Sequence, residues 1–284
     1  MSWHMPWKKQ RPEALAAVAQ RPDVSLLSDK GCKRPTNEDS GRVVDANNGA
    51  NSSRGLLVVV ADGMGGHEAG EIASQLATDT VATVYPIAGG TPGQALAEAF
   101  RQAHETIFHR ASHNHALKGM GSTCTAVAIV GNQAWAAHVG DSRLYLLRGQ
   151  DIYQLSEDHS AIMEMVRQGL ISEEEAAHHE DRNVLLRAMG TQPILDLVSW
   201  PEPMDVKPQD IFLLCSDGLY NLVSDSEINA VVRNAAPEDA CRKLVQMAND
   251  RGGHDNITVA IIAMPSGTQS PQHLKETREA GVHP

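Results

Sequence analysis

The chain has 284 residues, of which 42% are hydrophobic and 21% charged, and its formal net charge is −11 at pH 7. This composition is typical of a globular protein, and because the acidic balance repels a phosphate backbone we expect no nucleic-acid partner. No apolar run reaches the roughly 20 residues that span a bilayer, and no signal-peptide segment opens the chain, so we expect no membrane association and a cytoplasmic location.

The length is sufficient for one substantial core, and no linker divides its middle. Residues 1–22 mix tryptophans, prolines and basic residues without a sustained period, and residues 265–284 are polar, so both segments are predicted to be tails. One domain is therefore predicted over residues 23–264. The four cysteines form no CxxC pair, which in a chain without a secretory signal predicts free thiols.

In chain order, short runs of β-branched and apolar residues alternate with segments of helical character. Strands are predicted at 55–61, 122–130, 133–140, 143–148, 210–216 and 256–263. Helices are predicted from apolar spacing and capping residues at 67–85, 91–111, 224–235 and 237–250. Only Gly131-Asn132 separates the second strand from the third, which predicts a hairpin. Strands grouped as hairpins with helices between the groups favour an α+β domain with largely antiparallel sheets.

Four aspartates stand at the ends of apolar runs, three of them closing a run before a turn or polar break and Asp255 just before the last strand. They are Asp62 in VVVADGMGGH, Asp141 in AAHVGDSRLY, Asp217 in IFLLCSDGLY and Asp255 in GGHDNITVAII. Turn capping is the ordinary role of an Asp-Gly pair. Burial, however, disfavours an ionised carboxylate that no cation compensates, so acids that meet at one place predict a metal site. Their hard oxygen ligands favour Mg²⁺ or Mn²⁺.

The residues around these acids indicate a metal-dependent hydrolase. The run Gly63-Met64-Gly65-Gly66 after Asp62 leaves backbone carbonyls open to a ligand. If Asp62, Asp217 and Asp255 converge, they hold two cations with Asp62 as the bridge. A water between the two cations becomes a hydroxide near neutral pH, and this hydroxide is a nucleophile for phosphorus.

Arg34 is the candidate for binding the phosphate, because a guanidinium matches two phosphate oxygens at once. Glu38 and Asp39 follow in the same run, RPTNED, and are candidates for an outer shell that holds metal-bound waters. Residues 156–192 depart from the strand and helix rhythm. They contain a predicted helix at 159–168 and a second, acidic helix, and an excursion of this length beside a hydrolytic site is a candidate lid.

Eight blocks occur in an unbroken order between residues 34 and 258. They are RPTNED (34–39), ADGMGGH (61–67), GSTCTA (121–126), VGDSRLY (139–145), EDHS (157–160), NVLLRAMG (183–190), LLCSDGL (213–219) and HDNIT (254–258). With this ordered set the chain resembles the PPM/PP2C-family protein serine/threonine phosphatases of the bacterial type. The resemblance implies a sandwich of two antiparallel β-sheets flanked by α-helices, with residues 156–192 as the family's flap.

The resemblance also implies a site for two Mn²⁺ or Mg²⁺ ions and a third, weaker one. Asp62 would bridge the first two ions, Gly63 would lend its carbonyl, and Asp217 and Asp255 would complete the second position. Asp141 would share the third ion with Asp217. By the same resemblance Arg34 holds the substrate phosphate, and Glu38 and Asp39 belong to the outer shell.

One residue departs from the eukaryotic members of the family, which have a histidine general acid directly after the Asp-Gly pair. This chain has Met64 there, as bacterial members generally do. Two sources remain open for the proton of the leaving oxygen, namely His67 and a metal-bound water.

The sequence thus predicts a phosphatase that hydrolyses phosphoserine and phosphothreonine by a metal-bridged hydroxide, acts as a monomer and reverses a bacterial Ser/Thr kinase. Two alternatives belong to other classes. One is a pseudo-phosphatase that binds phosphoproteins without turnover, which the intact Asp62, Asp217 and Asp255 disfavour. The other is a two-metal phosphoesterase for small molecules or nucleotides.

Overall fold

The computed structural model describes residues 21–45, 54–65, 69–177, 179 and 184–266. The strands are β1 Asp23–Asp29, β2 Asp39–Asp45, β3 Leu56–Met64, β4 Gly121–Ser122, β5 Cys124–Val130, β6 Gln133–Val139, β7 Arg143–Arg148, β8 Asp151–Gln154, β9 Val198–Ser199, β10 Met204–Asp205, β11 Ile211–Cys215 and β12 Ile257–Ala263. The helices are α1 Ala69–Val84, α2 Pro92–His113, the 3₁₀ helix η1 His115–Leu117, α3 Ala161–Arg167, α4 Glu173–Ala177, α5 Asp217–Tyr220, α6 Asp225–Arg233 and α7 Pro237–Asp250.

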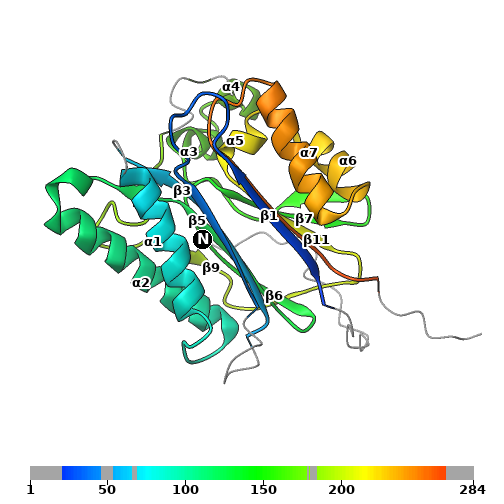
Figure 1. Cartoon of the computed structure of the whole chain (residues 1–284), viewed down its shortest axis with the longest axis horizontal. Coiled ribbons are helices and arrows are strands. Elements are labelled where there is room, and N and C mark those ends of the chain that lie inside the picture. Colours follow the sequence, from blue (N-terminus) through cyan, green and yellow to red (C-terminus); the bar gives the residue numbers. More distant parts are fainter. Residues whose placement is uncertain (1–20, 46–53, 66–68, 178, 180–183, 267–284) are drawn as a thin grey trace, which may run out of the picture.

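Two antiparallel sheets stack face to face. In the described part of the chain one sheet has the order β1-β12-β11-β7-β8 and the other the order β10-β6-β5-β3-β2, with β4 beside β3 and β9 beside β6. Helices α1 and α2 cover the outer face of the second sheet, and α6 and α7 cover the outer face of the first (Figure 1). The α+β sandwich of two antiparallel sheets predicted from the sequence is confirmed.

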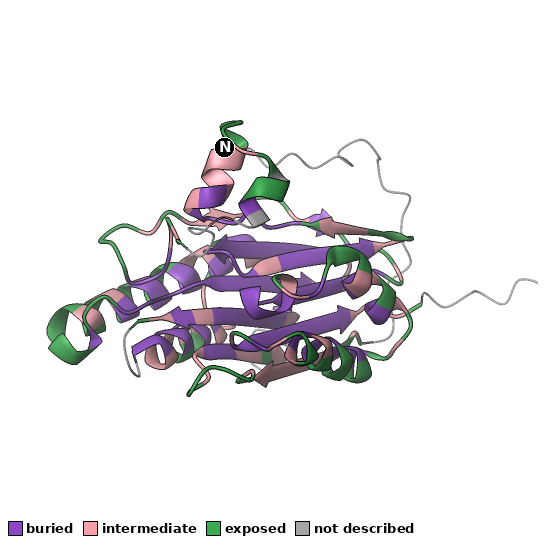
Figure 2. Cartoon of the chain, turned by 90° about the horizontal axis from the view of Figure 1, so that it is seen from above, coloured by how far each residue is buried: buried purple, intermediate pink, exposed green. Residues whose placement is uncertain are grey.

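A strand of either sheet contributes to two different hydrophobic cores, because its side chains alternate between the two faces of the sheet. In β3, Leu57 and Val59 pack toward α1 and α2, whereas Val58 and Val60 pack between the two sheets. Figure 2 shows the result, with buried strands inside and exposed residues along the outer sides of the helices. This pattern explains why β3 is apolar throughout, since neither of its faces meets solvent.

The predicted strands and helices are present, with ends that differ by a few residues. The hairpin at Gly131-Asn132 is confirmed by the pairing of Val130 with Gln133. The sequence missed β1, β2, β8, β9 and β10. β1 and β2 have half-buried, mixed polar sequences, DVSLLSD and DSGRVVD, which carry little apolar signal. In the flap, α3 is shorter than predicted and α4 is a single short helix.

All four cysteines lie among the described residues and are free, as predicted. In the regions the structure describes, no helix combines the length and the apolar character required to cross a membrane. β1 begins at Asp23 and β12 ends at Ala263, next to the predicted domain limits of 23 and 264. Residues 1–20 and 267–284, most of the two predicted tails, lie outside the described residues, so the division into domain and tails stays a prediction.

Candidate active site

The four sequence-predicted aspartates come from four different elements of the fold. Asp62 lies in β3, Asp217 begins α5, Asp255 precedes β12, and Asp141 lies in the turn between β6 and β7. Asp62 was predicted to end its strand. The strand instead continues to Met64, because Gly63 and Met64 pair with the short strand β4.

The charges of these acids act on one another. Burial raises the pKa of Asp62 well above its ordinary value, and the negative charges of Asp39, Asp217, Asp141 and Asp255 raise it further. The pKa of Asp141 is likewise raised, first by burial and then by Asp217. Without a cation, this arrangement holds ionised carboxylates at a cost in free energy.

Asp39 belongs to the centre of this cluster, closer than the sequence had indicated. It lies opposite Asp62 in the β2–β3 pairing. Ser216 Oγ donates to Asp39 Oδ2 at 2.7 Å, whereas Asp39 Oδ1 is buried without a hydrogen-bond partner among the described residues. Burial raises the pKa of Asp39 to about 7, and the charges of Asp217 and Asp255 act in the same direction.

Two glycines allow the chain to pass through this crowded site. A Cβ on Gly63 would lie 1.9 Å from the carbonyl oxygen of Gly70, and a Cβ on Gly218 would lie 2.0 Å from the carbonyl oxygen of Asn256. Any side chain at either position would therefore displace backbone. The Asp-Gly pairs of the sequence are explained by this close packing beside the acids.

Arg34 lies at the rim of the cluster. Its Nη2 donates to Asp255 Oδ2 at 2.7 Å, and its side chain remains 49% exposed. The charges of Asp255, Glu38 and Asp62 all raise the pKa of Arg34, so the guanidinium faces three acids while part of it stays open to solvent.

Glu38 lies beside the start of α1 and within reach of the charge of Asp255. Its carboxylate is close to the start of α1, where a Cβ on Gly70 would lie 2.6 Å from Glu38 Oε2. Burial raises the pKa of Glu38, while the charge of Arg34 lowers it. The main-chain carbonyl of Glu38 accepts a hydrogen bond from the N–H of Gly63 at 3.1 Å, so its backbone supports the end of β3 next to Asp62.

Several polar residues that hold the acids were not singled out from the sequence. The N–H of Asp62 donates to Thr123 Oγ1 at 2.8 Å, and Thr123 Oγ1 shares a 2.7 Å hydrogen bond with Ser142 Oγ. Both hydroxyls are buried, and Ser142 follows Asp141 directly. The backbone of Asp62 is therefore tied to the turn that carries Asp141. The blocks GSTCTA and GDSRLY contain these residues, but only the folded register shows that they meet.

The side chain of Asn256 holds the backbone of the loop that contains Arg34. Its Oδ1 accepts from the N–H of Glu38 at 2.8 Å, and its Nδ2 donates to the carbonyl oxygens of Lys30 and Thr36 at 2.8 and 2.9 Å. Because Asn256 follows Asp255, one amide fixes the loop that contains Arg34 to the loop that contains Asp255.

Two histidines lie buried behind the turn of Asp141. The rings of His138 and His159 are 4.8 Å apart between centroids. Burial lowers the pKa of His138 to about 4 and that of His159 to about 3. Both are therefore neutral near pH 7, and each is held by the structure, His138 by Thr125 and the carbonyl of Glu157, and His159 by the N–H of Gly140. His67, the candidate general acid, lies outside the described residues.

The donors present fit a divalent cation. Within the described part of the chain, no three or more His, Cys, Asp and Glu side chains stand together as a formed metal site; Asp255, for example, is turned to Arg34. The donor chemistry nevertheless consists of hard carboxylate oxygens, one of which, Asp39 Oδ1, is buried without a hydrogen-bond partner. Such a set matches Mg²⁺ or Mn²⁺, which would compensate the mutual repulsion.

Comparisons with known proteins define the family. The model of the protein phosphatase 2C family matches residues 38–259. The protein phosphatase PhpP of Streptococcus pneumoniae is 36% identical over 250 residues, which cover 85% of this chain and 97% of that protein. The chain therefore belongs to the protein phosphatase 2C family, and the serine/threonine protein phosphatase predicted from the sequence is confirmed at this level.

Solved structures agree with this assignment. The serine/threonine phosphatase PstP/Ppp of Mycobacterium tuberculosis has a TM-score of 0.76 and 34% identity, over 86% of this chain and 99% of that one. A catalytic domain of PstP in complex with two manganese ions has a TM-score of 0.74 and 34% identity, again over 86% of this chain and 99% of that one. The similarity thus extends over nearly the whole of each relative.

Proposed function

We propose that the carboxylate cluster is the metal centre of a phosphatase that removes phosphate from phosphoserine and phosphothreonine in proteins. Asp62, with the carbonyl of Gly63, would hold two Mn²⁺ or Mg²⁺ ions together with Asp217 and Asp255, and Asp141 would share a third with Asp217. The observation that carries this proposal is that burial, together with the charges of Asp39, Asp217, Asp141 and Asp255, raises the pKa of Asp62, as expected for acids that lie close to one another. The manganese-bound PstP catalytic domain supports the choice of ion.

When bound, such ions supply an activated water and neutralise the oxygens of the phosphoryl group. The side chains of the protein would position these ions, the water and the substrate. Asp39 and Glu38 would order water around the ions, and Ser216 keeps Asp39 in place through its 2.7 Å hydrogen bond. Thr123 keeps the backbone of Asp62 fixed, so that its carboxylate stays directed at the centre.

Arg34 would bind the substrate phosphate. Its hydrogen bond to Asp255 uses Nη2 alone, and because the side chain is half exposed its other N–H groups are open to two phosphate oxygens. The bond to Asp255 orients the guanidinium before substrate arrives, which lowers the entropy lost on binding. Arg34 would then compensate charge on the phosphoryl oxygens as the bond to the serine or threonine oxygen breaks.

The proton for the leaving oxygen has no assigned donor among the described residues. Met64 has no ionisable proton. His138 and His159 are buried, and they form hydrogen bonds with Thr125 and with the N–H of Gly140. His67 and a cation-bound water therefore stay the two candidates. A bacterial Ser/Thr kinase as the opposing enzyme, a cytoplasmic location and a monomeric state also stay proposals, as does the absence of a nucleic-acid partner.

The test is phosphate release from a phosphothreonine peptide as a function of Mn²⁺ concentration, with a chelator control. Wild type is compared with Asp62→Asn and with Asp79→Asn, a matched loss of a carboxylate that pairs with Arg42 on the surface. We expect metal-dependent turnover in wild type and Asp79→Asn, and its loss in Asp62→Asn, with circular dichroism to confirm that all three are folded.

Three results would contradict the proposal in whole or in part. Folded wild type without turnover on peptide or aryl phosphate at any Mn²⁺ or Mg²⁺ concentration would favour the pseudo-phosphatase. Turnover of a nucleotide but not of the peptide would favour a phosphoesterase for small molecules. Full activity of Asp62→Asn would refute the metal assignment while leaving the activity intact.

A further inference from the structure

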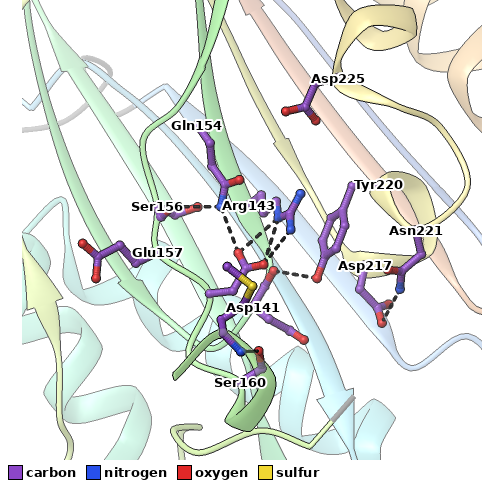
Figure 3. A network of polar contacts seen from close by, with 12 residues as sticks. Asp141, Arg143, Gln154, Ser156, Glu157, Ser160, Asp217, Tyr220, Asn221 and Asp225 are labelled. Carbon is purple, nitrogen blue, oxygen red and sulfur yellow. Dashed lines mark hydrogen bonds and ion pairs between the residues drawn. The ribbon is translucent and has the colours of Figure 1, made fainter. Parts of the chain in front are cut away.

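Arg143, a residue outside the proposed catalytic set, places its guanidinium near Asp141. Arg143, at the start of β7, has a side chain that is only 19% exposed, and its Nη2 donates to the buried Asp158 at 2.7 Å. Its Nε donates to both oxygens of the same carboxylate at 3.1 Å. The remaining nitrogen, Nη1, donates to the hydroxyl of Tyr145 at 3.0 Å. The guanidinium plane is therefore fixed (Figure 3).

The face of this guanidinium is covered by Tyr220. Arg143 Cζ lies 3.7 Å from the centroid of the Tyr220 ring, a close cation–π contact. The hydroxyl of Tyr220 donates to the main-chain oxygen of Asp141 at 3.1 Å. Figure 3 shows the tyrosine between the arginine on one side and α5 on the other, with its hydroxyl directed at Asp141.

Tyr220 also stands in a fixed relation to Asp217. Both belong to α5, where Asp217 is the first residue and Tyr220 the last, and the N–H of Asn221 closes the helical turn on the carbonyl of Asp217 at 3.0 Å. Asn221 Nδ2 donates to Asp217 Oδ2 at 3.2 Å. The hydroxyl of Tyr220, on α5, thus connects the helix that begins at Asp217 with the turn between β6 and β7 that carries Asp141.

We propose that Tyr220 is a positioning residue: held face-on by Arg143, its hydroxyl fixes the backbone of Asp141 relative to Asp217 and so sets how these two carboxylates share a cation. The inference rests on the proposed third-ion position of Asp141 and Asp217. Under this proposal, the affinity of the third position for Mn²⁺ depends on Tyr220, which does not itself contact the ion. Arg143 acts one step further out, because it orients the ring rather than the acid.

The chain offers a matched pair of variants for the test. Tyr220→Phe and Tyr145→Phe each remove one hydroxyl from a tyrosine that contacts Arg143. The hydroxyl of Tyr145 accepts from Arg143 and donates to Asp225 at 3.0 Å, and it has no bond to Asp141. Mn²⁺ binding to the full chain is measured by titration calorimetry without substrate, alongside the thermal midpoint of the metal-free proteins and circular dichroism.

We expect Tyr220→Phe to weaken the lowest-affinity Mn²⁺ binding event roughly fivefold, the worth of about one hydrogen bond, and to leave the tighter events unchanged. Tyr145→Phe should lower the thermal midpoint but leave every Mn²⁺ affinity as in wild type. Arg143→Lys, which keeps the charge but loses the planar fork, should act in the same direction as Tyr220→Phe.

Asp141→Asn separates the possible failures. If Asp141→Asn changes the wild-type isotherm and Tyr220→Phe does not, the positioning role is refuted and the proposed function stands. If Tyr145→Phe weakens the same event as much as Tyr220→Phe, the effect is general loosening and the inference is also refuted. If Asp141→Asn leaves the isotherm unchanged, the third-ion assignment fails and the inference with it, while the two-ion centre is untouched.

Discussion

Replacing Asp39 with asparagine should stabilise the metal-free protein. Burial and the neighbouring acids raise the pKa of this carboxyl from 3.8 to about 7. Between these two values the folded chain binds a proton that the unfolded chain has released, so the stability of the protein falls as the pH rises. At 1.36 kcal/mol per pKa unit, the charge of Asp39 costs on the order of 4 kcal/mol above pH 7.

The variant Asp39→Asn removes this charge and keeps the shape of the side chain. In urea unfolding with a chelator at pH 8, we expect it to exceed wild type by up to about 4 kcal/mol, and at pH 5 by less than half of that. Saturating Mn²⁺ should remove the difference, because a cation that binds the folded state compensates the wild-type carboxylate.

Asp210→Asn is the control with the opposite sign. Asp210 is buried, as Asp39 is, but Arg148 donates to both of its oxygens, at 2.9 and 2.6 Å. Loss of one partner from a buried pair costs about 3 kcal/mol or more. If Asp39→Asn is less stable than wild type at pH 8 without divalent ions, or if Asp210→Asn gains stability in the same way, the carboxylates of the cluster do not repel one another as argued.

Three further predictions concern the supports of the site. Thr123→Val removes the hydroxyl that accepts from the N–H of Asp62; it should cost about 2 kcal/mol in urea unfolding and weaken Mn²⁺ binding, and an unchanged Mn²⁺ affinity would show that other contacts hold Asp62. Gly63→Ala places a Cβ 1.9 Å from a carbonyl oxygen of α1, so we expect loss of Mn²⁺ binding or of folding; calorimetry that shows a folded variant with wild-type affinity would contradict this. Burial lowers the pKa of His138 from 6.5 to about 4, so without divalent ions the wild type should lose about 3 kcal/mol relative to His138→Asn as the pH falls through this window; parallel urea stability curves for the two proteins would count against it.

The sequence predicted those parts of the fold whose cause is local. The apolar run before Asp62 and the capped helix after Thr91 carry their signal within a few residues, and both occur where expected. β1 and β2 were missed because one partly polar strand gains its stability from its partner across the sheet, as in the pairing of Asp23 with Ala263.

The candidate site shows the same division. Asp62, Asp141 and Asp217 were predicted because each follows an apolar run, and Asp255 because it precedes one; in the folded chain the charges of the other three act on Asp62. The central place of Asp39 depends on its register opposite Asp62, which joins residues from two strands. The contact of Tyr220 with Asp141 spans 79 positions of the chain and has no counterpart in either local segment.

The alternation of β3 between two cores restricts how this protein can change its length. Leu57 and Asp62 are separated by an odd number of positions, so they lie on opposite faces of the strand, one toward the helices and one toward the other sheet. Deletion of one residue between them would exchange the two faces, sending either the carboxylate toward α1 or the leucine toward the other sheet. Loss or gain of two residues would keep both orientations, so in this segment evolution can tolerate even steps far better than odd ones.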